Sequence, residues 1–415
     1  MLLLKNVYLG GKTQDILIEH NCFKKIADEI NDDNADIKDC TGKAILPSFC
    51  NMHTHAAMMF LKGIGEDLEL FDWLQTKIWP LEAKLTGEDV YHLSKFAALE
   101  MIKTGTTMFL DMYFYVEETI KAIDEMGLRA GITYLGMDMF DEAETKRRLE
   151  NAEKFMKQSV PSTRIIKGLS AHAVYTASKE LIQGFKKIAR AHDAFFSIHV
   201  SETKKEVEDC LKKYGKTPLA LLDEWGVLDE KTIVAHAVHL TKEETDIAKK
   251  RKIVLAHNPV SNLKLNSGQM PLQAYLDKGL RVTLGTDGVS SNNSLSMIDE
   301  MKTAALSGKN IASDSTAAKV NDIFNMATIN GFEALGVKTG KIEEGYEADF
   351  MLVDLNNHTL LPNINLISNM VYAADSSCIT DVFCQGKPLM KNKCVENEDN
   401  IVLNFKKTCE ELLKD

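Results

Sequence analysis

The sequence predicts an α/β fold: a (β/α)₈ TIM barrel with a small β-sandwich domain formed by the N- and C-terminal segments. Three observations support this prediction. Eight short, apolar, β-rich runs alternate with amphipathic helical patterns from about residue 44 to about residue 340. Segments with strand-like patterns and turn residues, but without helical periodicity, occupy both ends of the chain. Polar residues recur at the carboxyl ends of the apolar runs.

The two ends of the chain contain the strands of the predicted small domain. The first 46 residues hold the strand-like segments LLLKNVYL and DILIEHNCFKKIAD, separated by the turn residues GGK. Beyond residue 344, the segments GYEADFMLVDLN and MVYAADSSCITDVFCQGKPLMKN indicate further short strands, and residues 401–414 indicate an amphipathic helix. We expect residues 1–46 and 345–415 to pair into one small β domain, and residues 47–344 to form the barrel.

The strands of the predicted barrel come from eight runs. In order they are KAILPSF, GTTMFLDMY, LRAGITYLGM, RIIKGLSAH, AFFSIHVSE, TIVAHAVHL, KIVLAHNP and LRVTLGTDG. Between them lie patterns such as GEDVYHLSKFAALEMIK, whose apolar residues recur at three- and four-residue spacing, as in a helix that packs on a sheet. A doubly wound open sheet shows the same alternation. We favour the barrel because of where the polar residues fall.

Those polar residues end seven of the eight runs. They are His53 and His55 after the first, Asp111 in the second, His172 in the fourth, His199 with Glu202 in the fifth, His236 in the sixth, His257 in the seventh and Asp287 in the eighth. All strand ends of a parallel barrel lie on one face, where active sites are built. Residues that are far apart in the sequence are therefore expected to converge there.

His53 and His55 can present two imidazoles to one point, because residues i and i+2 of a strand face the same side. A single histidine at a strand end more often serves packing. His199 and Asp287, however, would complete a set of three histidines and one aspartate with a position left for water, as in catalytic metal sites. We expect one divalent metal ion per chain, with Zn²⁺ as first choice and Fe²⁺ or Mn²⁺ as alternatives.

The composition limits which binding partners and which cellular compartment we expect. The 415-residue chain has a formal net charge of −11, which disfavours binding to nucleic acid and to anionic membranes. Its eight cysteines include no C-x-x-C pair, a usage typical of reduced thiols. No stretch approaches the roughly 20 apolar residues of a membrane span. We expect a cytoplasmic protein that acts on a small molecule.

Five strings resemble one enzyme superfamily. HTH, IHVSE, VAHAVHL, AHNPVSNLKL and LGTDGVSSNNSLSM are similar to the amidohydrolases, in their cytosine deaminase/chlorohydrolase branch, and there to the 5-methylthioadenosine/S-adenosylhomocysteine deaminases. The resemblance covers essentially the whole chain. It implies metal-dependent hydrolytic deamination of adenosine, 5′-methylthioadenosine or S-adenosylhomocysteine to inosine-type products and ammonia. It also implies a homo-oligomer, since relatives commonly form dimers or tetramers.

The resemblance implies roles for the strand-end residues. The metal ligands would be His53, His55, His199 and Asp287. Glu202 would shuttle protons and contact the ring, while His236 and Asp287 would orient the attacking water. Relatives with two metals carry a carboxylated lysine at the end of strand four. His172 stands in that neighbourhood here, so a single metal is implied.

The resemblance also implies substrate contacts. In the loop KGIGEDLELFDWLQTKIWPLEAK, Trp73 would wall the pocket and Glu82 would accept hydrogen bonds from the ribose, while His172 would contact the purine. Arg148 matches one of two arginines that bind the amino-acid tail of S-adenosylhomocysteine; Tyr134 stands where the other is expected. We therefore expect adenosine-type nucleosides to be deaminated faster than S-adenosylhomocysteine.

Two alternatives remain open at this point. The same barrel machinery could deaminate or dechlorinate another nitrogen heterocycle, such as guanine, a pterin or an s-triazine. A non-catalytic, amidohydrolase-like scaffold is the alternative from another class of protein.

Overall fold

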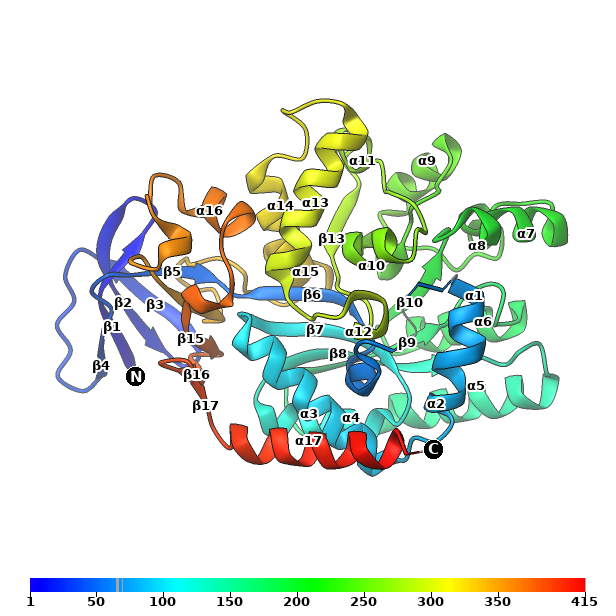
Figure 1. Cartoon of the computed structure of the whole chain (residues 1–415), viewed down its shortest axis with the longest axis horizontal. Coiled ribbons are helices and arrows are strands. Elements are labelled where there is room, and N and C mark those ends of the chain that lie inside the picture. The colour runs from blue at the N-terminus through cyan, green and yellow to red at the C-terminus, as the bar shows by residue number, and fades with distance from the viewer. Residues whose placement is uncertain (65–66, 69, 415) are drawn as a thin grey trace.

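The computed structural model describes residues 1–64, 67–68 and 70–414, and its barrel sheet has eight parallel strands in sequential order (Figure 1). These strands are β6 (Phe49–Thr54), β7 (Thr106–Tyr113), β8 (Arg129–Gly136), β9 (Ile165–Ala171), β10 (Phe195–Val200), β11 (Thr232–His236), β12 (Val254–His257) and β13 (Arg281–Leu284). A parallel bridge between Thr54 and Asp287 links the last strand back to the first. The predicted (β/α)₈ barrel is confirmed.

Helices follow the barrel strands and cover the outside of the barrel. Many begin at polar N-cap residues: the side chains of Thr86, Ser178 and Thr241 each accept a hydrogen bond from the backbone N–H three residues later. The longer helices are α3 (Gly87–Lys103), α4 (Val116–Met126), α5 (Glu142–Lys157), α6 (Lys179–Ala191), α7 (Lys204–Tyr214), α8 (Pro218–Glu224), α9 (Lys242–Arg251), α13 (Met297–Ala312) and α14 (Val320–Ala327). The shorter ones are α10 (Pro259–Lys264), α11 (Leu272–Asp277), α12 (Val289–Asn292) and α15 (Ile329–Ala334).

A short helical insert follows the first barrel strand. It consists of the 3₁₀ helix η1 (Ala56–Leu61), α1 (Leu70–Trp73), the π-helical turn η2 (Leu74–Ile78) and α2 (Trp79–Glu82). Figure 1 shows α1 and α2 near the carboxyl ends of the barrel strands. The insert corresponds to the loop that the sequence predicts to contact the substrate; residues 65, 66 and 69 of that loop lie outside the described residues.

The sheet of the small β domain, called the small sheet below, joins the two ends of the chain, as predicted. Its nine strands are β1 (Leu2–Leu9), β2 (Lys12–Glu19), β3 (Cys22–Ala27), β4 (Asp36–Asp39), β5 (Lys43–Pro47), β14 (Phe350–Asp354), β15 (Ile379–Cys384), β16 (Lys387–Lys391) and β17 (Cys394–Val395). Strand β5 pairs with β14 in antiparallel register. The ring of Phe350 packs against Phe23 and stacks on Phe383, with centroids 5.8 and 4.5 Å apart.

Two predicted strands differ in the structure. The run KAILPSF forms two strands rather than one: β5 belongs to the small sheet and ends at Pro47, and the barrel strand β6 begins at Phe49. Proline has no N–H to continue a ladder, which is consistent with the end of β5 at Pro47. The segment MVY (370–372) is the end of α16 (Leu366–Tyr372), because Asn365 caps this helix by accepting from the Ser368 N–H. We retain 1–46, 47–344 and 345–415 as proposed domain boundaries.

The last helix, α17 (Glu398–Leu412), lies along α3 of the barrel rather than on the small sheet (Figure 1). The rings of Phe405 and Phe96 stack with centroids 3.7 Å apart. The C-terminal segment thus contributes both to the small sheet and to the outer layer of the barrel. None of the helices in the described residues combines the length and the hydropathy that crossing a membrane requires.

A buried ion pair joins the barrel to the small sheet. Arg129, at the start of β8, donates from Nε to Asp349 Oδ2 at 2.5 Å and from Nη2 to Glu347 Oε2 at 2.5 Å. The side chains of Arg129 and Asp349 are 4% and 0% exposed. The small sheet therefore lies beyond the amino ends of the barrel strands and leaves their carboxyl ends open for a site (Figure 1).

Replacing Arg129 with alanine is expected to lower the free energy of unfolding by about 3–5 kcal/mol, because it leaves the Asp349 carboxylate buried without its cation. Denaturant titration followed by circular dichroism measures this loss. Arg147→Ala serves as the control, since Arg147 is 61% exposed in its pair with Glu144 and its loss should leave stability unchanged. Equal stabilities of the two variants would contradict the expectation.

Candidate active site

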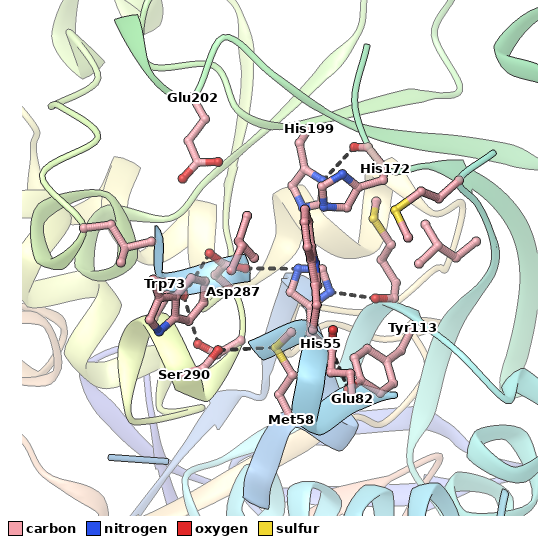
Figure 2. A pocket seen from close by; sticks show the side chains of 18 of the residues that line it. His55, Met58, Trp73, Glu82, Tyr113, His172, His199, Glu202, Asp287 and Ser290 are labelled. Carbon is pink, nitrogen blue, oxygen red and sulfur yellow. Dashed lines mark hydrogen bonds and ion pairs between the residues drawn. The ribbon is translucent and has the colours of Figure 1, made fainter. Parts of the chain in front are cut away.

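One pocket at the carboxyl ends of the barrel strands collects most of the predicted site residues (Figure 2). Its lining includes His55, Trp73, Glu82, His172, His199, Glu202, His236 and Asp287. His53 is fully buried beside them, with its ring centroid 4.9 Å from that of His55 and 4.8 Å from that of His199. Side chains from five barrel strands and from the insert therefore meet at one place.

The potential ligand atoms of this pocket fall into two groups of three, and both groups contain His53. His55 Nε2 lies 3.2 Å from Asp287 Oδ1, and His53 Nε2 lies 3.4 Å from the same oxygen. His199 Nε2 is 3.1 Å from His53 Nε2. A tetrahedral site with metal–ligand bonds of about 2.0–2.1 Å has six edges of about 3.3 Å, and these three separations are close to that length. His236 also lies within reach, because one nitrogen each of His53, His199 and His236 fall within 4.8 Å of one another.

Hydrogen bonds behind the ligands fix their orientation. His55 Nδ1 donates to the Met112 carbonyl at 2.6 Å, and His199 Nδ1 donates to the His172 carbonyl at 2.7 Å. A carbonyl only accepts, so Nδ1 carries the hydrogen of each ring and Nε2 faces the centre. These supports for the ring orientation are the pattern found behind metal-bound histidines.

The Asp287 carboxylate is oriented in the same way. Its Oδ2 accepts hydrogen bonds from Ser261 Oγ at 2.6 Å and Ser291 Oγ at 3.0 Å, which turns Oδ1 toward the histidines. Asp287 itself follows β13 with a left-handed backbone (φ 64°). Together with the imidazoles, this arrangement fits a divalent cation.

Burial keeps most of these histidines neutral. It lowers the pKa of His53 and of His236 to about 4 and that of His172 to about 3. Burial also acts on His55, but hydrogen bonding and charge from Asp287 outweigh it and raise the pKa of His55 to about 9. The carboxylate therefore attracts positive charge to the point between the imidazoles, which is where a cation would bind.

Glu202 lies at the edge of the same cluster. Ser267 Oγ donates to its Oε1 at 3.1 Å, and its Oε2 lies 3.7 Å from His236 Nε2. Burial and the nearby Asp287 charge raise the pKa of Glu202 to about 8. A carboxyl group that both gains and loses protons near neutral pH is suited to general acid–base chemistry.

Backbone contacts hold Glu202 in place. Glu206 accepts from the N–H groups of Ser201 and Glu202 at 2.9 and 2.7 Å, and Ser201 has a left-handed backbone (φ 52°). The sequence analysis did not identify Glu206 or the serines 261, 267 and 291 as site residues. Ser261 lies in AHNPVSNLKL, and Ser291 lies in the loop after Asp287. Ser267 and Glu206 lie two and four residues beyond AHNPVSNLKL and IHVSE, so their proximity to the predicted residues was the available signal.

The rest of the pocket wall is largely apolar. Its further lining residues are Met58, Leu74, Trp79, Met112, Tyr113, Phe114, Leu135, Met137, Tyr175, Leu265, Gly288, Ser290 and Ser291. Trp73 is buried in this wall, and His172 bonds through Nδ1 to the Thr176 hydroxyl at 2.8 Å. Glu82 accepts a hydrogen bond from the Tyr113 hydroxyl at 2.7 Å. Among the described lining residues, none is a lysine or an arginine.

Two predicted positions require correction. Arg148 does not line the pocket: it lies on the outer helix α5, where its Nε donates to Glu144 Oε1 at 2.6 Å and its Nη1 donates to the Leu135 carbonyl. Tyr134 faces the outer helices and packs against the rings of Phe155 and Phe185. A side chain at position 134 points away from the pocket, because neighbouring strand residues alternate between the two faces of a sheet.

Two further strand-end residues also lie outside the pocket lining. Asp111 accepts from the Thr54 hydroxyl and from the Ala56 N–H, and so supports the turn after the two histidines. His257 is buried at the end of β12, and burial lowers its pKa to about 3.

Comparison with known proteins gives consistent results. The model of the amidohydrolase family matches residues 44–389. The chain is 43% identical to a 5′-deoxyadenosine deaminase of Methanocaldococcus jannaschii over 397 residues, which cover 94% of each chain. It is 42% identical to a 5-methylthioadenosine/S-adenosylhomocysteine deaminase of Thermococcus onnurineus over 400 residues, again 94% of each chain.

A solved structure is similar over the whole fold. An adenosine deaminase from Xanthomonas campestris with bound zinc superposes with a TM-score of 0.93 at 28% identity, covering 99% of this chain and 98% of that chain. The family match, the relatives and the shared fold lead to one conclusion: this chain belongs to the amidohydrolase family.

Proposed function

We propose that this protein is a metal-dependent hydrolase that deaminates adenine nucleosides, forming inosine-type products and ammonia. The observation that carries the proposal is the cluster of His53, His55 and Asp287, with His199 beside His53, next to a buried Glu202 and a mostly apolar pocket. The names of the relatives support the choice of substrate, since they are deaminases of 5′-deoxyadenosine and of methylthioadenosine or S-adenosylhomocysteine.

These four residues are proposed to hold one divalent metal ion per chain. Zn²⁺ is the first choice, because imidazole and carboxylate donors suit it and the similar Xanthomonas campestris enzyme is described with bound zinc. Fe²⁺ and Mn²⁺ suit the same donors. A bound divalent cation would supply Lewis acidity, which lowers the pKa of a water ligand towards about 7.

Glu202 is proposed to move the protons of the reaction. In its protonated form it donates to the ring nitrogen beside the carbon that bears the amino group, which makes that carbon more electrophilic. It then accepts a proton from the water as the carbon–oxygen bond forms, and passes it to the amino group as the carbon–nitrogen bond breaks. Ammonia leaves, the ring retains the oxygen of the water as a carbonyl, and the second proton of the water returns to Glu202, which restores its protonated form. The raised pKa of Glu202, about 8, suits a group that must carry a proton in part of this cycle.

The neighbours of Glu202 are proposed to orient the water. Asp287, held by two serine hydroxyls, offers an acceptor for its hydrogen. His236 Nε2 lies 3.7 Å from Glu202 Oε2, so both groups face the same part of the pocket. Ser267 keeps Glu202 Oε1 in a hydrogen bond, which leaves Oε2 directed toward His236.

The nucleoside is proposed to lie against the remaining wall. Trp73 supplies an aromatic face and His172, neutral at pH 7, a hydrogen-bonding edge for the purine, while Glu82 accepts from the ribose hydroxyls. The 5′ group then meets apolar side chains such as Leu135 and Met137. An uncharged 5′ substituent is therefore the better fit.

We expect kcat/KM for 5′-deoxyadenosine and 5′-methylthioadenosine to exceed that for S-adenosylhomocysteine by at least about tenfold. The tail of S-adenosylhomocysteine carries a carboxylate and an ammonium group, which would lose hydration without meeting a lysine or arginine among the described lining residues. Ammonia release under initial-rate conditions measures the ratio. Equal or faster turnover of S-adenosylhomocysteine would refute this preference.

A substrate panel with metal-loaded protein tests the function itself. The panel contains adenosine, 5′-deoxyadenosine and 5′-methylthioadenosine beside guanine, a pterin and an s-triazine. We expect ammonia from the three adenine nucleosides. Turnover confined to the other heterocycles, or no turnover by protein that has bound its metal, would overturn the proposal.

A further inference from the structure

The helical insert at residues 70–82 forms one wall of the pocket and is joined to a barrel strand by a side-chain hydrogen bond. Trp73, Leu74, Trp79 and Glu82 of this insert line the pocket. Among the hydrogen bonds made by the described parts of residues 70–82, the bond from the Tyr113 hydroxyl to Glu82 Oε1 is the one that reaches a barrel strand. Its length is 2.7 Å, and Figure 2 shows the two side chains next to each other.

Tyr113 is a rigid partner for this bond. It is the last residue of β7 and is 3% exposed, and its ring lies beside that of His55 with centroids 6.5 Å apart. Glu82, by contrast, ends a four-residue helix. The position of the Glu82 carboxylate is therefore set by the barrel through the tyrosine hydroxyl.

The bond also affects what Glu82 can recognise. An ionised carboxylate only accepts hydrogen bonds, and its two oxygens can receive several donors. Burial raises the pKa of Glu82, and the hydrogen bond from Tyr113 opposes this rise and favours the ionised form. With Oε1 taken by Tyr113, the described part of the chain provides no further hydrogen bond to the carboxylate, so Oε2 can accept from a ligand.

Building on the proposed function, we propose that Tyr113 is a positioning residue for ribose recognition. By holding Glu82 Oε1, it aims Oε2 at the 2′- and 3′-hydroxyls of the nucleoside. Removing the tyrosine hydroxyl should therefore weaken the recognition of the ribose hydroxyls and leave the steps at the purine unchanged. The specificity for a ribonucleoside would then depend on a residue that does not itself contact the sugar.

The test compares two substrates in two proteins. Tyr113→Phe keeps the ring beside His55 and removes only the hydroxyl. We expect kcat/KM for adenosine to fall about tenfold, mainly through KM, as for the loss of one hydrogen bond to a charged group. For 2′,3′-dideoxyadenosine, which lacks the ribose hydroxyls, we expect a change of less than about twofold. The ratio of kcat/KM for adenosine to kcat/KM for 2′,3′-dideoxyadenosine should therefore fall about tenfold.

Two further variants make the test specific. Glu82→Gln should lower the same ratio, and adding Tyr113→Phe to it should cause little further loss, because both changes remove one interaction. Tyr91→Phe is the matched control: the Tyr91 hydroxyl donates to Glu125 at 2.6 Å outside the pocket lining, so its removal should leave both substrates unaffected.

The outcomes separate this inference from the proposed function. If Tyr113→Phe lowers kcat/KM for both substrates by the same factor, or for neither, the role of Tyr113 in ribose recognition is refuted while the deaminase activity stands. If the wild-type protein deaminates no adenine nucleoside, the proposed function fails and this inference fails with it.

Discussion

Glu202→Gln is expected to lower kcat for adenine nucleosides by about 10²–10⁴-fold while leaving the metal content of the protein unchanged. Glutamine has nearly the same shape as glutamate, and it can keep the contact with Ser267. It cannot give up and regain a proton at the ring nitrogen and the leaving amino group. Steady-state kinetics, together with metal analysis of the same preparation, measures both expectations.

Glu208→Gln is the matched control for this variant. Glu208 lies on α7, six residues beyond Glu202, and its side chain is exposed. We expect its substitution to leave kcat and metal content as they are. A Glu202→Gln protein that retains more than about a tenth of wild-type activity would show that another group moves the protons.

Asp287→Asn is expected to weaken metal binding by more than about 100-fold and to reduce deamination to background. The loss of a ligand should exceed the roughly 10–100-fold effect of losing a group that only orients a ligand. The double variant Ser261→Ala/Ser291→Ala is expected to weaken metal binding by only this smaller factor, since both serines bond to Asp287 Oδ2 and orient the carboxylate. Titration of the metal-free protein with Zn²⁺ gives the three affinities.

Asp299→Asn is the control for the change of charge, because Asp299 is exposed on α13. The Asp299→Asn protein should bind Zn²⁺ with the same affinity as the wild type. If Asp287→Asn also bound the metal with wild-type affinity, the ligand set would have to be reassigned to His53, His199 and His236, the second group of donors in the pocket.

The fold could be predicted because the alternation of strands and helices extends over about 300 residues, and because chemistry-bearing residues end the strands. The residue at which the chain leaves one sheet and enters the other could not be predicted. Residues 44–50 form a nearly continuous apolar run, and only the pairing of β5 with β14, some 300 residues away, assigns its first part to the small sheet. Local pattern carries no information about such a partner.

The histidines and acids of the site were predictable for the same reason, since the ends of parallel strands meet. The direction in which the Tyr134 side chain points could not be predicted. Strands of a barrel are buried on both faces, so the run GITYLGM shows no alternation to tell the pocket side from the helix side. Arg148 lies on a helix, and its pairing with Glu144 there could be recognised only once α5 was placed outside the barrel.

Anomalous diffraction from crystals of the zinc-loaded protein tests the metal site most directly. We predict one zinc peak per chain at about 2.0–2.2 Å from the Nε2 atoms of His53, His55 and His199 and from Oδ1 of Asp287. The absence of a peak at this position, or a peak that lies away from Asp287, would contradict the proposed chemistry.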